Sequence, residues 1–158
     1  MRVGITGHRG LPEESAKLVQ AAIHETVGRY AAADLVGVSC IADGPDAWFA
    51  QTVLNHGGHL EVVVPARDYR ASLPEWHHAT YDSLLLRASE VHETGLHESN
   101  SQAHMTGSEI LVGLADEVIA VWDGQPARGY GGTADVVSYA ESNGVPVRVV
   151  WPDGANRD

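Results

Sequence analysis

Two short glycine-containing segments, far apart in the chain, have the residue types of a phosphate-binding loop. The first is VGITGHRG at residues 3–10, where an apolar run breaks into glycines, a hydroxyl, an imidazole and a guanidinium directly before a helix signal. The second is GYGGT at residues 129–133, which also precedes a helix signal. Glycines allow backbone N–H groups to approach an anion, and the following helix directs its positive end the same way. We therefore predict that the two segments share one nucleotide-like ligand.

The candidate ligand-binding residues in these segments are Gly7, His8, Arg9, Gly131, Gly132 and Thr133. A structural interpretation is also open for each segment. The first can be a tight strand-to-helix turn with Arg9 in solvent, and the second a flexible turn in which Thr133 caps a helix. A third loop, ADGPD at residues 42–46, adds Asp43 and Asp46, which can accept a ribose hydroxyl or simply stabilise a helix N-terminus.

Two further carboxylates are candidates for catalysis. Asp123 follows an apolar strand and can act as a base or accept a hydroxyl, whereas Glu109 lies among apolar helix residues and can face a cleft. For Glu109 a solvated helix face is the simpler interpretation. The glycine pattern is not the dinucleotide fingerprint GxGxxG, and the first loop lacks the P-loop lysine. Both absences argue against an NAD oxidoreductase or an ATPase.

The middle of the chain also contains residue types that bind metals: His92, Glu93, His97, Glu98 and His104. They match no ligand spacing such as HExxH, so we predict no metal site and no cofactor.

The composition limits the partners and the compartment. The 158 residues carry a net charge of -11, so a large polyanion such as duplex DNA is repelled and nucleic acid is not expected as a partner. Cys40 is the only cysteine, which excludes an internal disulfide. No apolar run approaches the ~18 residues of a membrane span, and no targeting segment is recognisable, so we expect a cytoplasmic protein without a membrane partner.

Apolar strands alternate with amphipathic helices, which is typical of parallel βαβ units. Strands are expected at residues 2–6, 35–39, 60–64, 117–122 and 145–150, with a possible edge strand at 89–93. Helices are expected at residues 12–33, 46–56, 74–88, 101–114 and 133–143. The predicted fold class is α/β: a single Rossmann-like three-layer domain over residues 1–152, with a mostly parallel sheet of five to six strands and helices on both faces. Residues 153–158 form a polar tail that we expect to be frayed.

The strand order predicts where a ligand binds. With the order 3-2-1-4-5 for the main strands, the winding reverses between the first strand and the strand at 117–122. Ligands of such folds bind beyond the carboxyl ends of the strands at that reversal. Because these two strands carry the two glycine segments, we expect the segments to converge on one pocket.

The GITGHR opening, the ADGPD loop and the GGT turn resemble the SLOG superfamily. This Rossmann-like group includes the cytokinin-activating LOG phosphoribohydrolases, the DNA-processing protein A family and several nucleotide-sensing domains. The resemblance covers almost the whole chain. It implies a nucleotide or nucleotide-derived ligand and a homodimer.

The sequence departs from the LOG enzymes at their catalytic positions. Those enzymes carry a PGGxGTxxE motif with a catalytic glutamate and an arginine on the preceding helix, but here Val136 stands three residues after Thr133, and residues 102–114 contain no arginine. Hydrolysis of an N-glycosidic bond needs a carboxylate near the ribose. The carboxylates available for this role are Asp123, Asp135 and Glu109. We therefore expect a binding or sensing module, with a nucleoside 5'-monophosphate N-glycosidase as the alternative.

Overall fold

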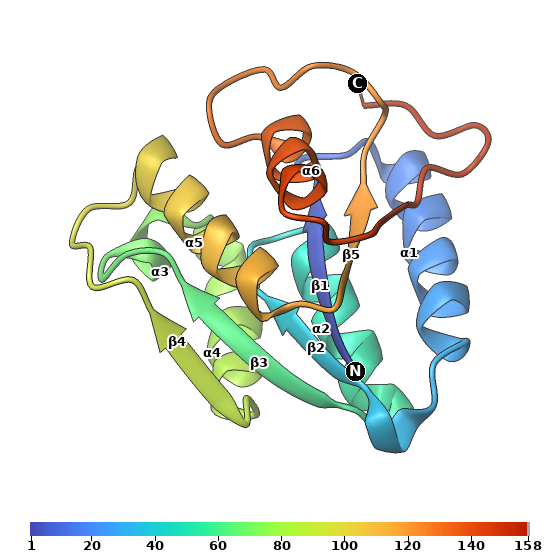
Figure 1. Ribbon diagram of the computed structural model, residues 1–158, viewed down its shortest axis with the longest axis horizontal. Coiled ribbons are helices and arrows are strands. Elements are labelled where there is room, and N and C mark those ends of the chain that lie inside the picture. The colour runs from blue at the N-terminus through green and yellow to red at the C-terminus, as the bar shows by residue number, and fades with distance from the viewer. Residues whose placement is uncertain (158) are drawn as a thin grey trace.

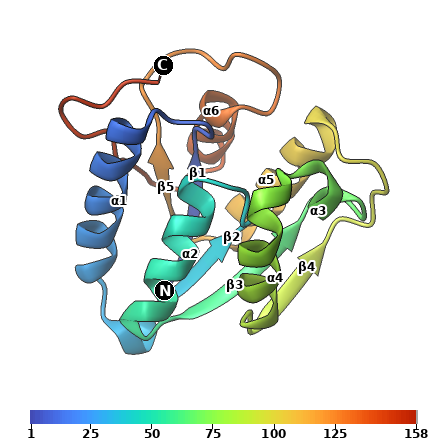
Figure 2. The same ribbon diagram turned by 180° about the vertical axis from the view of Figure 1, so that it is seen from behind.

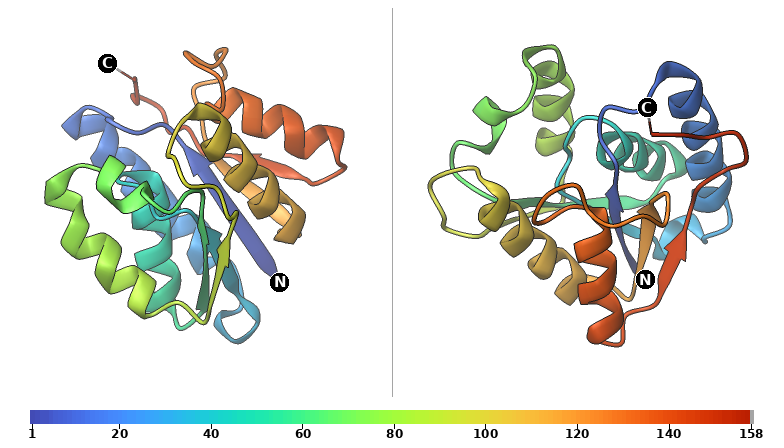
Figure 3. Two further views of the ribbon diagram at one scale, coloured as in Figure 1. Left: turned by 90° about the vertical axis from the view of Figure 1, so that its left-hand side faces the viewer. Right: turned by 90° about the horizontal axis from the view of Figure 1, so that it is seen from above.

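The computed structural model describes residues 1–157 (Figure 1). The strands are β1 (Arg2–Gly7), β2 (Val36–Ser39), β3 (His59–Val64), β4 (Glu90–Glu93), β5 (Glu117–Val121) and β6 (Val147–Val149). The helices are α1 (Glu13–Gly28), α2 (Pro45–His56), α3 (Tyr69–Ser72), α4 (His78–Leu86), α5 (Ser101–Leu114) and α6 (Thr133–Ser142), with 3-10 turns η1 (Ala32–Asp34) and η2 (Glu75–His77). The sheet is the middle of three layers, with α1, α2 and α4 on one face and α5 and α6 on the other (Figure 3). No helix among the described residues has the length and apolar character needed to cross a membrane.

The sheet has six strands in the order β4-β3-β2-β1-β5-β6, and every pair is parallel. This arrangement confirms the predicted fold class and strand order, including the edge strand at 89–93. The chain winds outward from β1 to β4 and then returns to the other side of β1 with β5. Gly7 at the end of β1 is in register with Val121 at the end of β5, so the two loops that follow these strands start side by side.

The centre of the sheet is buried on both faces. On one face, Val3 and Ile5 of β1 pack with Ile23 of α1 and Phe49 of α2. On the other face, α5 approaches β1 so closely that a Cβ added at Gly4 would lie 2.6 Å from the Leu111 side chain. Strands that are apolar and covered on both faces are typical of a parallel sheet. The packing on both faces holds the carboxyl ends of β1 and β5 in place.

The ends of two helices follow the local signals in the sequence. Asn100 caps α5, because its side chain accepts a hydrogen bond from the Ala103 N–H at 2.8 Å. Gly57 ends α2 in the left-handed conformation, with φ +99°. Both ends agree with the helix bounds expected at 101–114 and 46–56.

Two predicted helices have different bounds in the structure. The helix expected at 12–33 ends at Gly28, and Tyr30 packs from the following turn, where its hydroxyl donates to Glu117. Between residues 67 and 88, where we expect a loop and one helix, the chain forms α3, η2 and α4. Pro74 lacks an N–H and has extended backbone angles, so no helix continues through it.

The expectation that the tail is frayed is wrong for its described part. The Asn156 N–H donates to Ser15 Oγ at 2.8 Å, and the tail lies beside the start of α1 (Figure 2). The Trp151 ring also packs edge-on against the His8 ring, with centroids 5.7 Å apart. These contacts join residues distant in sequence, so composition alone did not indicate them. Residue 158 lies outside the described residues.

Candidate functional site

A cavity of about 280 Å³ lies at the carboxyl ends of β1 and β5. It brings together six of the predicted ligand-binding residues: Gly7, His8, Arg9, Gly131, Gly132 and Thr133. Asp46 of α2 lines it as well. The convergence expected from the strand order is therefore present in the fold.

The loop after β1 is fixed by close contacts at Gly7 and His8. A Cβ added at Gly7 would lie 2.8 Å from Val121 and 2.9 Å from Pro45, so only glycine fits without displacement. His8 is 4% exposed, and its Nε2 lies 3.1 Å from a carboxylate oxygen of Asp123. Its Nδ1 is buried without a hydrogen-bond partner among the described residues. Burial lowers the pKa of His8, and the Arg157 guanidinium lowers it further, so the ring is neutral at neutral pH.

Arg9 lines the cavity and is held in place by Asp43. Its Nε and Nη2 donate to the same Asp43 oxygen at 3.0 and 2.6 Å. The Arg9 side chain is 44% exposed, whereas that of Asp43 is 10% exposed. Asp43 therefore orients the guanidinium. A ribose contact by Asp43 stays a prediction.

The loop before α6 presents backbone groups to the cavity. Gly131 has φ +84°, and its N–H donates to the Asp135 carboxylate at 2.9 Å. The cap residue is Gly132, so Thr133 is the first residue of α6 and its backbone is helical. Within the described chain no side chain caps this helix, and its first N–H groups remain available to an anion.

Asp46 is an acid in the wall of this cavity. Burial raises its pKa to about 7, although a hydrogen bond from the Ala42 N–H and the charge of Arg9 act in the opposite direction. Arg9 donates to Asp43, so among residues 1–157 no cation is bonded to Asp46. At neutral pH the Asp46 carboxyl can therefore either donate or accept a proton.

The sequence analysis missed several residues that complete the cavity: Tyr69, His104, Ser108 and Arg157. They come from α3, α5 and the tail, which carry no glycine motif. His104 was considered only as a metal ligand, yet its Nε2 lies 2.7 Å from Ser99 Oγ, and burial lowers its pKa. One indication for the two residues on α5 was present in the sequence, namely the predicted helix at 101–114. The first turns of this helix pack against Gly131.

The two predicted catalytic carboxylates lie elsewhere. Neither Asp123 nor Glu109 is among the residues that line the cavity. Burial favours the neutral form of Asp123, but hydrogen bonds from the Gln125 N–H and from His8 outweigh it and lower its pKa. Ionised Asp123 therefore accepts from its neighbours and positions His8. A catalytic role for either residue stays a prediction.

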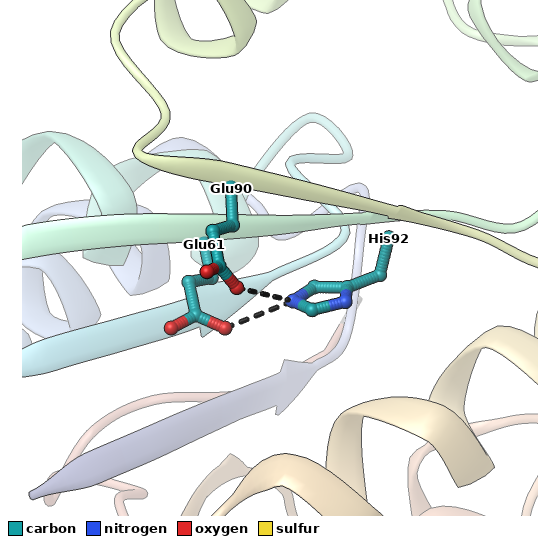
Figure 4. A group of neighbouring side chains, drawn as sticks. All are labelled: Glu61, Glu90 and His92. Carbon is teal, nitrogen blue, oxygen red and sulfur yellow. Dashed lines mark hydrogen bonds and ion pairs between the residues drawn. The ribbon is translucent and has the colours of Figure 1, made fainter.

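A second group of ionisable side chains lies where β3 and β4 pair, and includes His92 (Figure 4). His92 Nε2 is 2.9 Å from Glu61 and 3.5 Å from Glu90. The other oxygen of Glu61 accepts from Arg2 Nε at 3.1 Å. Such donors can hold a metal, but Arg2 and His92 already satisfy the buried Glu61 carboxylate, so ion pairing accounts for the arrangement.

Comparison with known proteins identifies relatives by structure only. The sequence matches no known family profile and no curated protein. DNA processing protein A (DprA) from Streptococcus pneumoniae is 20% identical with a TM-score of 0.66, over 94% of this chain and 49% of that chain. DprA from Helicobacter pylori is 16% identical with a TM-score of 0.68, over 99% and 68%. A molybdenum cofactor carrier protein from Chlamydomonas reinhardtii is 14% identical with a TM-score of 0.59, over 94% and 74%.

These similarities confirm that this chain has the Rossmann-like α/β fold of these proteins. This chain spans about half the length of the S. pneumoniae DprA.

The comparisons also correct one expectation. The H. pylori DprA has a single-stranded DNA binding mode, so the expectation that nucleic acid is an unlikely partner for a chain of this fold was wrong. Net charge averages over the whole surface, whereas a single strand contacts a local groove.

Proposed function

We propose that this chain is a binding or sensing module for a nucleotide or nucleotide-derived molecule, whose phosphate lies between the two glycine-rich loops. The observation that carries the proposal is that residues of both loops line one and the same cavity. The uncapped start of α6 and the guanidinium groups of Arg9 and Arg157 supply donors to an anion there. The likeness to a molybdenum cofactor carrier is consistent with binding without turnover.

The test is ligand binding by wild type and loop variants. Isothermal titration with AMP, ADP-ribose and related compounds should give binding, and each bound compound should raise the melting temperature and be recovered unchanged. Thr133→Val and Arg9→Ala each remove a donor at the cavity and should weaken binding about tenfold. Arg87→Ala, at the exposed end of α4, is the matched control. Unchanged affinity in both loop variants, or no binding across the panel, would reject the proposal.

Hydrolysis of an N-glycosidic bond is a second candidate, and Asp46 favours it. An acid with a pKa of about 7 in the cavity wall is suited to proton transfer at neutral pH. Chromatography of nucleoside monophosphates incubated with the protein should then show free base, and Asp46→Asn should abolish its release. Asp123→Ala and Glu109→Ala test the carboxylates expected from the sequence. Intact nucleotides after long incubation would leave binding as the function.

Single-stranded DNA belongs among the ligands to test, because the fold is shared with the H. pylori DprA. A labelled oligothymidylate in a gel shift at low salt provides the measurement. Phosphate contacts along a strand would make its affinity fall steeply with salt. A cytoplasmic homodimer is a further part of the proposal, and light scattering tests the dimer.

A further inference from the structure

A second cavity, of about 430 Å³, lies next to the first loop. Gly10, Leu11, Trp48 of α2 and Trp76 of η2 are among its lining residues, and we call it the aromatic groove. Trp76 is 75% exposed. Burial of so large an aromatic surface would be favourable. Aromatic surfaces that stay exposed to water therefore often mark binding sites.

The chemistry of the aromatic groove fits a flat, uncharged ring. Its acid, Asp43, is paired with Arg9, and the ring of His77 is bonded through Nε2 to the Ile41 carbonyl at 2.9 Å. The other polar side-chain groups in the lining are Thr80, Gln51, whose amide donates to Asn55 at 3.0 Å, and the indole N–H groups of Trp48 and Trp76. Indole faces stack on heterocycles, and a few polar groups can bind the ring edge.

We call the cavity between the two glycine loops the phosphate cavity. It and the aromatic groove lie on opposite sides of the Arg9–Asp43 pair. Arg9 lines the phosphate cavity, and its partner Asp43 lines the aromatic groove. The two loops touch there, since a Cβ added at Gly44 would lie 3.7 Å from Arg9 Cα. A molecule that occupies both cavities must therefore pass the Arg9–Asp43 pair, which lies between them.

We propose that the aromatic groove binds the heterocyclic ring, of nucleobase type, of the same molecule whose phosphate lies between the glycine loops. This inference rests on the proposed function. It assigns Trp76 as the stacking surface and makes the ligand one that spans two cavities.

The experiment compares Trp76→Ala with the wild type in titrations with AMP, GMP, CMP, UMP and ribose 5-phosphate. Loss of a stacking surface should weaken binding of a nucleotide about five- to hundredfold. Ribose 5-phosphate has no ring of this kind, so its affinity should not change. Trp76→Phe should retain part of the affinity. Leu86→Ala, which truncates a side chain that is 87% exposed, should change nothing.

The outcomes separate the two proposals. If ribose 5-phosphate binds and Thr133→Val weakens it, but Trp76→Ala leaves every nucleotide affinity unchanged, the inference fails and the proposed function stands. An equal loss for ribose 5-phosphate and the nucleotides in Trp76→Ala also overturns the inference. No binding of any compound overturns both. Thymidine monophosphate and an oligothymidylate are two further arms. Binding of the mononucleotide identifies a free nucleotide as the source of the ring, and binding of the oligothymidylate alone identifies a strand. Trp76→Ala should weaken whichever of them binds.

Discussion

Asp46 should make the stability of this protein depend on pH in a direction unusual for a carboxylate. Burial raises its pKa from 3.8 to about 7. In the unfolded chain the carboxyl ionises near its ordinary value, but in the folded protein it keeps its proton until near neutral pH. Between these values the folded state binds more protons, so the free energy of unfolding falls as pH rises. The contribution is fully present below about pH 4 and lost above about pH 7.

The size of this effect follows from the same values. A tenfold change in an acidity constant corresponds to about 1.4 kcal/mol, so ionising Asp46 in the folded protein costs about 4 kcal/mol. Asp46→Asn removes the ionisation and still offers an oxygen to the Ala42 N–H. The difference in the free energy of unfolding, variant minus wild type, should therefore increase by about 3 kcal/mol between pH 5 and pH 8.

Urea unfolding of both proteins at pH 5, 6, 7 and 8 measures this difference. Comparing the two proteins at each pH cancels the other titrating groups that they share. Asp153→Asn, at an exposed position in the tail, is the control for loss of a charge. A difference between wild type and Asp46→Asn that stays constant from pH 5 to pH 8 would refute the reasoning, because the carboxyl would then ionise alike in both states.

Three further predictions concern the loop after β1, the start of α5 and the Glu61 cluster, and urea unfolding checks each of them. Gly7→Ala should destabilise the fold by about 1–3 kcal/mol, since the new methyl group meets Val121 at 2.8 Å; a smaller effect would show that the loop can shift. Asn100→Ala should cost about 1 kcal/mol through loss of the cap of α5, and an unchanged midpoint would contradict the cap. Glu61→Ala should cost about 1–3 kcal/mol, because the carboxylate is 5% exposed, whereas Glu90→Ala, 60% exposed, should cost less than about 0.5 kcal/mol. Equal effects at Glu61 and Glu90 would count against the buried cluster.

The strand order and the meeting of the two loops could be predicted from the sequence because both follow from local signals and general rules. Apolar runs of four to six residues, separated by helical patterns, leave few arrangements once crossovers are right-handed. The reversal at β1 then places the end of β1 beside the end of β5, as the pairing of Gly7 with Val121 shows. No knowledge of side-chain packing was needed for that step.

Other parts of the site depend on packing and could not be predicted in this way. Arg157 reaches the cavity because the tail is bonded to α1, and Tyr69 reaches it from a helix of four residues. Neither position has a spacing or a motif that indicates its destination. Trp76 could not be predicted either, because an isolated aromatic residue has no periodicity and its exposure is visible only in the fold.

The charges around the cavity decide which groups would hold a phosphate under the proposed function. The two side chains of the first loop that can carry positive charge are paired with acids, Arg9 with Asp43 and His8 with Asp123. Burial also keeps His8 neutral. An anion therefore meets little net positive charge in the first loop. Its stabilisation has to come from oriented donors, namely the backbone N–H groups at the start of α6, the guanidinium of Arg9 and that of Arg157 in the cavity wall. Recognition by fixed donors depends on their geometry, so the proposed function requires the paired ends of β1 and β5 to keep the two loops in place.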